Sequence, residues 1–359
     1  MESFFYITPD TAINIIKIFT LGSLGFLIAF IAAPFLIKFL YKYELWRKEV
    51  RTKAIDGGGT PIFQKFHSEG ETHVPRFGGI LILVIPLFLA GLFLMLSKTG
   101  IWYFQKLNFF SRPQTWLPIF ALAGASLVGL ADDLLQVYGR GKYIGGGLSL
   151  RYRLSLVILI GLIGAWWFFA KLGWSSLHIP GFGDVYIGIW YIPLFIFTML
   201  ATYTGGVIDG IDGLAGGVFV SIFGAFAGIA LFLGQIDIAA FCAVIIGVLF
   251  AFLWFNIPPA RFYMGETGIM GLTAALTVIA FLTDSFLVLP IIGFLLLLEA
   301  LSVIIQLASK RFRHKKVFLA APIHLHLEAK GWPPYKVTMR FWIIGVVMAA
   351  IGLGIRLLG

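Results

Sequence analysis

The chain has 359 residues, of which 59% are hydrophobic and only 12% are charged, and its formal net charge is +10. The core of a soluble protein cannot hold so much apolar side chain, so this composition excludes a soluble globular protein and indicates a polytopic membrane protein. The single cysteine, Cys242, also excludes internal disulfides and zinc sites built from several cysteines. We expect one integral membrane domain over residues 1–359, because no long linker or internal repeat divides the chain.

Apolar segments give the number of membrane-spanning helices. A helix needs about 20 apolar residues to cross ~30 Å of hydrocarbon. Ten segments qualify, the eighth being short, and they lie near residues 18–41, 78–97, 115–131, 154–170, 187–204, 213–234, 236–255, 268–283, 285–307 and 340–358. We therefore predict an all-α polytopic membrane protein with about ten transmembrane helices and both termini on the same side.

Basic residues give the orientation of these helices. The loops after the first, third, fifth, seventh and ninth segments contain 20 of the 27 lysine and arginine residues, whereas residues 1–14 contain none. Cytoplasmic loops are enriched in basic residues, so we place these five loops in the cytoplasm and both termini outside. Binding to nucleic acid is not expected, because the basic residues follow the topology and form no separate basic domain.

Glycine and proline indicate local turns at three places. The segments Val137–Tyr143 and His178–Gly188 have the glycine pattern of small β-hairpins, the second of them on the outer face. Pro290 and Gly293 should kink the ninth helix. Such a bend would either open a side groove for a lipid tail or serve packing alone.

Four polar segments end apolar runs, and the helix count places all four on the cytoplasmic face. Ionisable side chains beside the hydrocarbon are costly, which makes them candidates for a functional site. The four segments contain Asp132 and Asp133, then Asp209 and Asp212, then Glu266, and finally His324 and His326.

Each segment also has an interpretation without function. Asp132 and Asp133 could mark the end of a helix at the water boundary, and the two histidines could be polar surface residues.

Asp209 and Asp212 would share a face of one helical turn, where neighbouring glycine amides suit a phosphate. Taken together, and with Arg153 nearby, the four segments favour a diphosphate substrate held by a divalent cation.

The type of donor atom indicates the metal. Carboxylates are hard oxygen ligands, so Mg²⁺ or Mn²⁺ is favoured over zinc. An ion-coupled transporter is an alternative from a different class of protein, since carboxylates relay ions in such carriers. It is disfavoured because these acids lie at helix ends on one face, whereas an ion pathway should place some of them near the midplane of the membrane.

Several motifs, in order along most of the chain, resemble the polyprenyl-phosphate N-acetylhexosamine-1-phosphate transferases. They are Leu130-Ala-Asp-Asp-Leu, Ile208-Asp-Gly-Ile-Asp-Gly-Leu-Ala, Leu253-Trp-Phe-Asn, Tyr263-Met-Gly-Glu-Thr-Gly and Ala321-Pro-Ile-His-Leu-His-Leu-Glu-Ala-Lys-Gly-Trp-Pro. The last of these is similar to the phospho-N-acetylmuramoyl-pentapeptide-transferase branch. That branch has ten transmembrane helices with both ends outside, in the bacterial cytoplasmic (inner) membrane, and an active site that faces the cytoplasm.

The resemblance implies a reaction and its partners. UDP-N-acetylmuramoyl-pentapeptide and undecaprenyl phosphate would give lipid I and UMP in peptidoglycan synthesis, with Mg²⁺ as the cofactor. The alternative within the same chemistry is a transferase for another UDP-N-acetylhexosamine, such as UDP-GlcNAc. A homodimer is compatible with the sequence, which does not determine the oligomeric state.

The resemblance also implies roles for individual residues. Asp132 is the candidate base for the lipid phosphate, and Tyr263 takes the place of an aromatic residue that stacks on uracil. The implied catalytic residues are Asp132, Asp133, Asp212 and His324, and the implied metal ligands are Glu266 and Asp133. The implied substrate-binding residues are Asp209, Asn256, Tyr263, Arg153 and His326.

The chain departs from the family pattern at several of these positions, which favours a relaxed donor preference or a weaker enzyme as alternatives. Glu266 replaces an aspartate, so Glu266→Asp is expected to retain or raise activity. Arg153 replaces a lysine, so a planar guanidinium fork takes the place of a point charge. The other departures are Leu325 for the middle histidine of a triplet, Tyr203 and Gly206 for asparagines, and Val74-Pro-Arg-Phe-Gly-Gly for Thr-Pro-Thr-Met-Gly-Gly.

Overall fold

The computed structural model describes residues 9–50, 52, 58–60, 64, 70–111, 113–140 and 146–359. In this part of the chain, nine helices are long and apolar enough to cross a membrane, which confirms the predicted all-α polytopic fold. They are α1 (Pro9–Lys42), α3 (Gly79–Ser97), α5 (Pro113–Val137), α6 (Leu150–Trp166) with its π-helical extension Trp167–Lys171, α7 (Tyr191–Gly205), α8 (Leu214–Phe232), α9 (Ile236–Asn256), α10 (Gly265–Leu282) and α14 (Pro334–Leu358).

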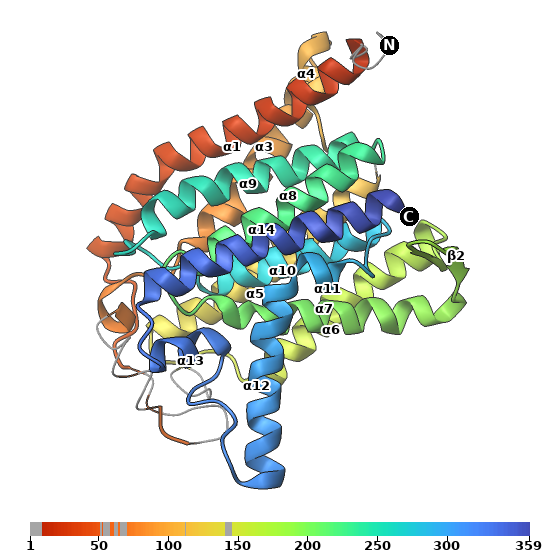
Figure 1. The fold of residues 1–359 in the computed structure, drawn as a ribbon. Helices are drawn as coiled ribbons and strands as arrows, with labels where there is room; N and C mark the ends of the chain where they lie inside the picture. The colour runs from red at the N-terminus through yellow and green to blue at the C-terminus, as the bar shows by residue number, and fades with distance from the viewer. Residues whose placement is uncertain are drawn as a thin grey trace, which may run out of the picture.

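The ninth apolar segment forms two helices instead of one. It is divided into α11 (Leu289–Ile292) and α12 (Phe294–Arg313), and Gly293 lies between them. The predicted kink is therefore confirmed, and it is a complete break. Figure 1 shows that α12 leaves the bundle at a steep angle to α14 and extends well beyond the other helices.

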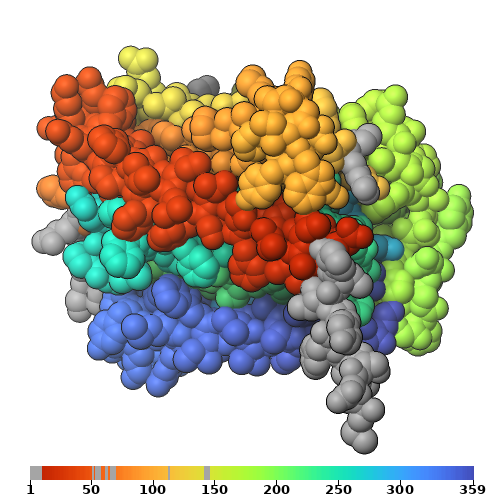
Figure 2. Space-filling view, turned by 90° about the horizontal axis from the view of Figure 1, so that it is seen from above, coloured from red at the N-terminus to blue at the C-terminus, as the bar shows by residue number. Residues whose placement is uncertain are grey.

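The helices pack in two groups around α10. On one side α1 packs on α9, α9 on α8, and α8 on α14, and Figure 2 shows α1 along the surface of the bundle beside α9. On the other side α10 packs on α5, α7 and α3. Every residue of α10 except Glu266 is buried. The one carboxylate of the central helix is therefore also its one residue within reach of solvent.

Small residues allow α10 to approach its neighbours closely, as they do in many membrane bundles. A Cβ atom on Gly79 of α3 would lie 2.1 Å from the main-chain nitrogen of Gly268, and one on Gly271 would lie 2.0 Å from the Ser126 hydroxyl of α5. These contacts fix the start of α10 against the ends of α3 and α5, which is where the polar segments lie.

The two ends of the bundle differ. The start of α1, the C-terminus and the hairpin of β1 (Ser176–Ile179) and β2 (Gly183–Tyr186) lie at one end, and α13 (Ile323–Ala329) lies at the other (Figure 1). The predicted outer hairpin is thus confirmed. In the other predicted hairpin, Val137–Tyr143, α5 runs to Val137 and a turn follows at residues 138–139, while residues 141–145 lie outside the described residues.

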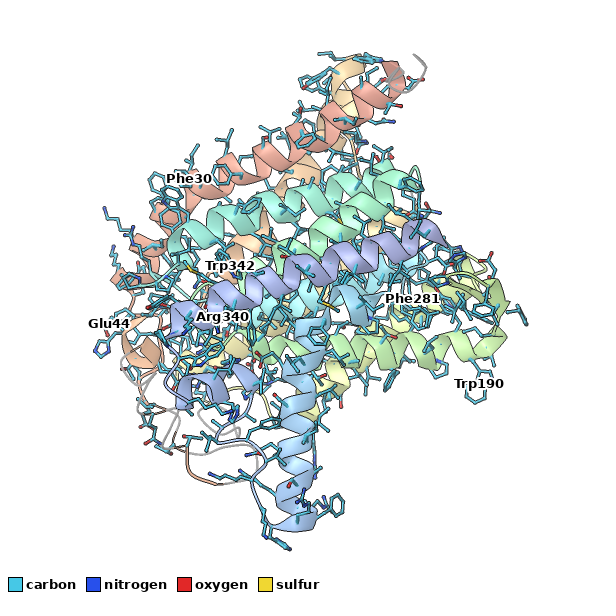
Figure 3. All side chains as sticks on the ribbon, in the orientation of Figure 1. Phe30, Glu44, Trp190, Phe281, Arg340 and Trp342 are labelled. Atoms are coloured by element: carbon cyan, nitrogen blue, oxygen red, sulfur yellow. The ribbon has the colours of Figure 1, made fainter. Side chains whose placement is uncertain are left out.

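Aromatic side chains pack the core toward the hairpin end. Phe281 of α10 lies 4.8 Å from Phe195 and 5.4 Å from Tyr191, measured between ring centroids (Figure 3). The remaining short helix, α4 (Trp102–Leu107), packs against α3 and α1 at the same end. The polar groups at the opposite end are therefore held by a rigid apolar bundle.

Candidate active site

Asp132 and Asp133 do not lie at a water boundary. Helix α5 continues past them to Val137, and both side chains are 0% exposed. The boundary interpretation is therefore wrong. Burial of two adjacent carboxylates requires hydrogen-bond donors around them, and the structure supplies a different set to each.

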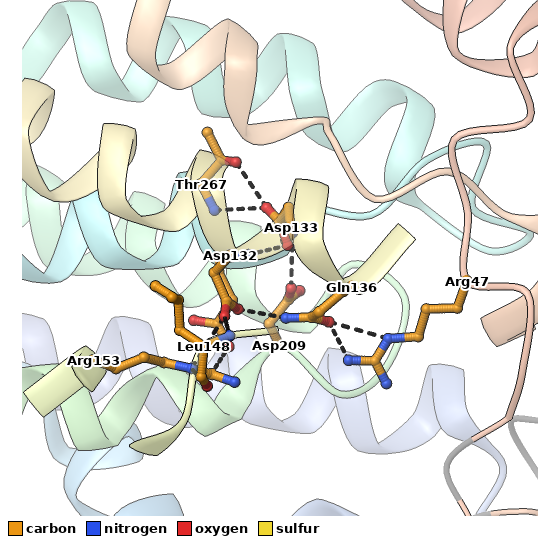
Figure 4. Close-up of polar contacts among 10 residues, drawn as sticks. Arg47, Asp132, Asp133, Gln136, Leu148, Arg153, Asp209 and Thr267 are labelled. Carbon is orange, nitrogen blue, oxygen red and sulfur yellow. Dashed lines mark hydrogen bonds and ion pairs between the residues drawn. The ribbon is translucent and has the colours of Figure 1, made fainter. Parts of the chain in front are cut away.

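Asp133 caps the start of α10 from another helix. Its Oδ1 accepts the main-chain N–H of Glu266 at 3.0 Å, and its Oδ2 accepts the N–H and the hydroxyl of Thr267 at 2.8 and 2.7 Å (Figure 4). The first N–H groups of a helix lack partners within it and favour negative charge, and Met264 at the N-cap position provides no side-chain cap. Asp133 thereby fixes the backbone of Glu266 relative to α5.

Asp132 is held by a second set of donors. Its Oδ1 accepts the Leu148 N–H at 2.6 Å and lies 3.3 Å from Arg153 Nε, and its Oδ2 accepts the Gln136 amide (Figure 4). The Gln136 carbonyl in turn accepts hydrogen bonds from Arg47. Such a satisfied network orients the Asp132 carboxylate and compensates for its burial.

Arg153 joins two of the positions that depart from the family pattern. Its Nη1 lies 2.9 Å from Glu266 Oε1, and its side chain is 8% exposed against 24% for Glu266. Tyr203, a third departure, also interacts electrostatically with Arg153. At the fourth, Gly206, a Cβ atom would lie 2.3 Å from Ile269 Cγ2, so Ile269 leaves no room for an asparagine there.

Asp209 and Asp212 lie in the connection between residues 206–208 and α8, so the prediction that they share one helical turn is wrong. The physical reason is the glycine pattern, since Gly213 has φ 75°, a left-handed conformation that starts α8 only after both acids. Asp209 Oδ2 accepts the Gly265 N–H at 3.2 Å, whereas Asp212 Oδ2 accepts the Ala260 N–H at 2.9 Å. Asp209 therefore meets Asp133 and Glu266 at the start of α10.

The environment of Asp209 changes its acidity. Burial raises the pKa of its carboxyl to about 6, although the neighbouring Arg76 guanidinium acts in the opposite direction. At neutral pH the carboxylate is therefore charged, but at a cost that a bound cation would reduce.

Asn256 and Tyr263 hold the loops of the site in place. Asn256 is buried, its Oδ1 accepts the Gly213 N–H at 3.0 Å and its Nδ2 donates to the Phe262 carbonyl at 2.9 Å. The Tyr263 N–H donates to the Pro75 carbonyl at 2.7 Å, and burial raises the pKa of its phenol. Both polar atoms of the Asn256 side-chain amide thus form hydrogen bonds that connect the two loops.

The structure separates the two histidines. His324 of α13 is buried, its Nδ1 lies 3.0 Å from Glu299 Oε2, and a Cβ atom on Gly210 would lie 2.1 Å from its Nε2. Burial acts to lower the pKa of His324, but the carboxylates of Glu299, Glu328 and Asp209 together outweigh it, so the pKa lies above its ordinary value. His326 instead accepts the Leu319 N–H at 3.1 Å through Nδ1. Only His324 therefore adjoins the Asp209 loop.

Three functional candidates were missed in the sequence. Glu299 interrupts the apolar run Phe294-Leu-Leu-Leu-Leu-Glu, a signal that should have singled it out. Arg76 lies in the motif Val74-Pro-Arg-Phe-Gly-Gly, which was noted only as a departure. Thr267 has no signal in sequence, because its role depends on Asp133, which lies 134 residues earlier.

The donor set fits a hard divalent cation held by few protein ligands. Glu266, Asp133 and Asp209 offer carboxylate oxygens alone, and Mg²⁺ usually takes one or two carboxylates together with substrate phosphate. Among the described residues, the only three groups with ligand atoms within 4.8 Å of one another are His178, Asp184 and Asp284, at the hairpin end. The acids of the candidate site therefore do not form a closed cage.

Comparison with known proteins gives consistent matches. Residues 115–284 match the glycosyl transferase family 4. The chain is 34% identical to the phospho-N-acetylmuramoyl-pentapeptide-transferase of Geobacillus sp. (strain WCH70), over 93% of this chain and 96% of that protein. It is 32% identical to the protein of the same name from Pelagibacter ubique (strain HTCC1062), over 91% of this chain and 89% of that protein.

Proposed function

Because the chain belongs to the phospho-N-acetylmuramoyl-pentapeptide-transferase family, we infer that it transfers phospho-N-acetylmuramoyl-pentapeptide from a UDP-linked donor to undecaprenyl phosphate. The products are lipid I and UMP, and the reaction is a step of peptidoglycan synthesis. The observation that carries this inference is the 34% identity to such a transferase over nearly the full length of both chains. A transporter is not supported, since these relatives are transferases.

The location of the reaction follows from topology. The protein is a multi-pass membrane protein, and the candidate site lies at the end of the bundle opposite to the start of α1 and the C-terminus (Figure 1). The loops at the end that carries the site contain most of the lysine and arginine residues, which favours a cytoplasmic position. We place the site at the cytoplasmic face of a bacterial inner membrane, where a soluble nucleotide donor can meet a lipid acceptor.

The reaction forms one phosphorus–oxygen bond and breaks another. An oxygen of undecaprenyl phosphate attacks the phosphorus attached to the sugar, and the bond to the UMP oxygen breaks. Asp132 is the candidate base that accepts the proton of the lipid phosphate, and Arg153 Nε at 3.3 Å keeps its carboxylate oriented. Asp212 is assigned to the same catalytic group.

Glu266 and Asp133 would hold Mg²⁺, which supplies charge neutralisation for the diphosphate and the leaving UMP when it is bound. Glu266 is the residue of α10 within reach of solvent, and Asp133 Oδ1 accepts a single N–H among the described residues, so lone pairs are left for a cation. His324, whose pKa the Glu299 carboxylate raises, would donate to a substrate phosphate from Nε2 when it is protonated.

The remaining assigned residues bind the donor. Tyr263 is assigned to the uracil ring, and Asp209, Asn256, Arg153 and His326 are assigned to the nucleotide and its phosphates. For Asn256 the contacts with Gly213 and Phe262 support an indirect role, in which it fixes the shape of the loops. For His326 the contact with Leu319 supports a role at the edge of the site.

A second donor is the competing function. Val74-Pro-Arg-Phe-Gly-Gly resembles the sister transferases that use UDP-GlcNAc, and this segment contacts the residues just before α10, since the Gly78 and Gly79 N–H groups donate to Tyr263 and Met264 carbonyls at 2.8 and 2.9 Å. The substrate test is therefore direct. Purified protein with Mg²⁺ and undecaprenyl phosphate should release UMP from UDP-N-acetylmuramoyl-pentapeptide.

The Asp133→Asn variant should abolish this release, and Asp184→Asn in the outer hairpin should leave it unchanged. Release of UMP from UDP-GlcNAc alone would move the protein to the sister branch. Release from neither donor, by protein that is folded in detergent, would contradict the proposed function.

A further inference from the structure

Arg76 is a partly buried cation with unused hydrogen-bond donors. Its Nε atom is buried and has no hydrogen-bond partner, and no ion pair or hydrogen bond of its guanidinium occurs among the described residues. A buried donor without a partner costs free energy, and a buried charge costs more. Native proteins rarely retain such a group unless it meets a ligand.

The backbone places Arg76 at the centre of the site. Its own N–H donates to the Leu45 carbonyl at 3.3 Å, and its neighbours Gly78 and Gly79 donate to the segment that starts α10. The Arg76 carbonyl lies 2.2 Å from where a Cβ atom on Gly265 would be, so the two main chains are in direct contact. The guanidinium therefore emerges beside the residues that begin α10.

Carboxylates surround this guanidinium without pairing with it. Asp133, Glu71, Asp209 and Glu266 all act on it electrostatically, and together they raise the pKa of Arg76 against the lowering effect of burial. The oxygens of these acids are engaged elsewhere: Asp133 with α10, Glu266 with Arg153, and Glu71 with Arg47. The acids hold the positive charge in place and leave its planar donor fork free.

We propose that Arg76 binds a phosphate oxygen of the substrate diphosphate beside the carboxylates of the site, an assignment that rests on the proposed function. Arginine presents parallel N–H donors that match phosphate oxygens, and such contacts are strong where water is largely excluded. The fixed charge allows the diphosphate to approach the acids before a cation is bound. Arg76 is thereby a second source of positive charge next to the metal.

This role has two opposite consequences. Removal of Arg76 weakens the binding of a diphosphate, because donors and charge are lost. The same change strengthens the binding of Mg²⁺ alone, because the acids lose a neighbouring cation that repels it. A residue that only maintained the fold would weaken both interactions when it was replaced.

The test measures both interactions by isothermal titration calorimetry on the full-length protein in detergent. Inorganic pyrophosphate is titrated in the presence of EDTA, and Mg²⁺ is titrated without nucleotide. We compare wild type, Arg76→Thr, Arg76→Lys and the matched control Arg313→Thr, which changes an exposed arginine at the end of α12. Arg76→Thr should bind pyrophosphate at least tenfold more weakly and Mg²⁺ severalfold more tightly, Arg76→Lys should be intermediate, and the control should equal wild type.

Unchanged pyrophosphate affinity in Arg76→Thr would overturn the proposal. Weaker binding of both ligands by this variant would overturn it too, since that result marks a structural role, and the unfolding temperature of each variant checks for such damage. The outcome is independent of the donor, because pyrophosphate carries neither sugar nor peptide. A failed UMP-release assay with a positive result here would reject the proposed reaction and retain the phosphate site.

Discussion

Arg153 and Glu266 are joined by an ion pair of 2.9 Å, although 113 residues separate them in the chain. Each of them departs from the family pattern, the first by a guanidinium for an ammonium and the second by an added methylene. The two departures meet in one contact. The longer carboxylate and the forked cation therefore form a matched pair, and the same arginine also orients Asp132.

This contact changes the expectation for Glu266→Asp. An aspartate would draw the carboxylate back by one methylene and away from Arg153, and the loss of a charge-assisted hydrogen bond costs about 1.5–3 kcal/mol. We therefore expect kcat/KM for UMP release to fall by about 10- to 100-fold.

The double variant Glu266→Asp with Arg153→Lys provides the control for this prediction. It restores the family pair, so it should recover activity beyond Glu266→Asp alone. Equal or higher activity of the single variant, as the sequence by itself favours, would show that the Arg153 contact has no part in the reaction.

Thr267 should stabilise the start of α10 through Asp133. Thr267→Val removes the hydroxyl donor at 2.7 Å from a buried carboxylate while keeping the side-chain shape. We expect a loss of about 1.5–3 kcal/mol in unfolding free energy, together with lower activity, because one of the three hydrogen bonds that hold Asp133 against the start of α10 is lost. The control is Thr273→Val, whose hydroxyl donates only to carbonyls of its own helix. Equal losses in the two variants, measured by unfolding in detergent, would contradict a special role for the cap.

Gly265 should tolerate no side chain. It has φ 72°, and a Cβ atom would lie 2.2 Å from the Arg76 carbonyl and 2.6 Å from Asp133 Oδ2. Gly265→Ala should therefore combine backbone strain with steric overlap, for a total of roughly 2–5 kcal/mol.

The matched control for Gly265 is Gly234→Ala. Gly234 has nearly the same φ, 71°, but nothing lies within 4 Å of its Cβ position. It should cost only the strain, about 1–2 kcal/mol. Similar unfolding temperatures for the two alanine variants would refute the close approach of Arg76 and Asp133 to Gly265.

Asp209 should make stability depend on pH in metal-free protein. Because the pKa in the folded state, about 6, lies above the ordinary value of 3.8, the protonated form stabilises the fold. This contribution is complete below about pH 4 and is lost as the pH rises through 6. Asp209→Asn has no such loss, so it should be more stable than wild type at pH 7.5 by on the order of 1–3 kcal/mol. The difference should shrink at pH 5.

Unfolding of both proteins in EDTA across this pH range provides the measurement. Asp184→Asn, which removes an exposed carboxylate at the other end of the bundle, controls for the change in net charge. A stability difference that stays constant from pH 5 to pH 7.5 would exclude a raised pKa for Asp209.

Local sequence patterns predicted the membrane class, the helix positions and the outer hairpin. The break in the ninth helix was likewise visible in Pro290 and Gly293. The motif resemblance located the carboxylates and His324, but it gave no contact among them. The helical spacing predicted for Asp209 and Asp212 was wrong. Gly213 adopts a left-handed conformation, and α8 begins only after both acids.

The sequence by itself determined that this protein crosses the membrane many times and which end carries its polar segments. Hydrophobicity and loop charge decide those properties, and both can be summed along the sequence without knowing which segments contact one another in space. The tertiary structure alone decided that Asp133 caps α10, that Arg153 pairs with Glu266 and that Arg76 lies unpaired among four acids. These relationships arise where distant helices pack through glycine, as at Gly79 and Gly268, so no local pattern can encode them.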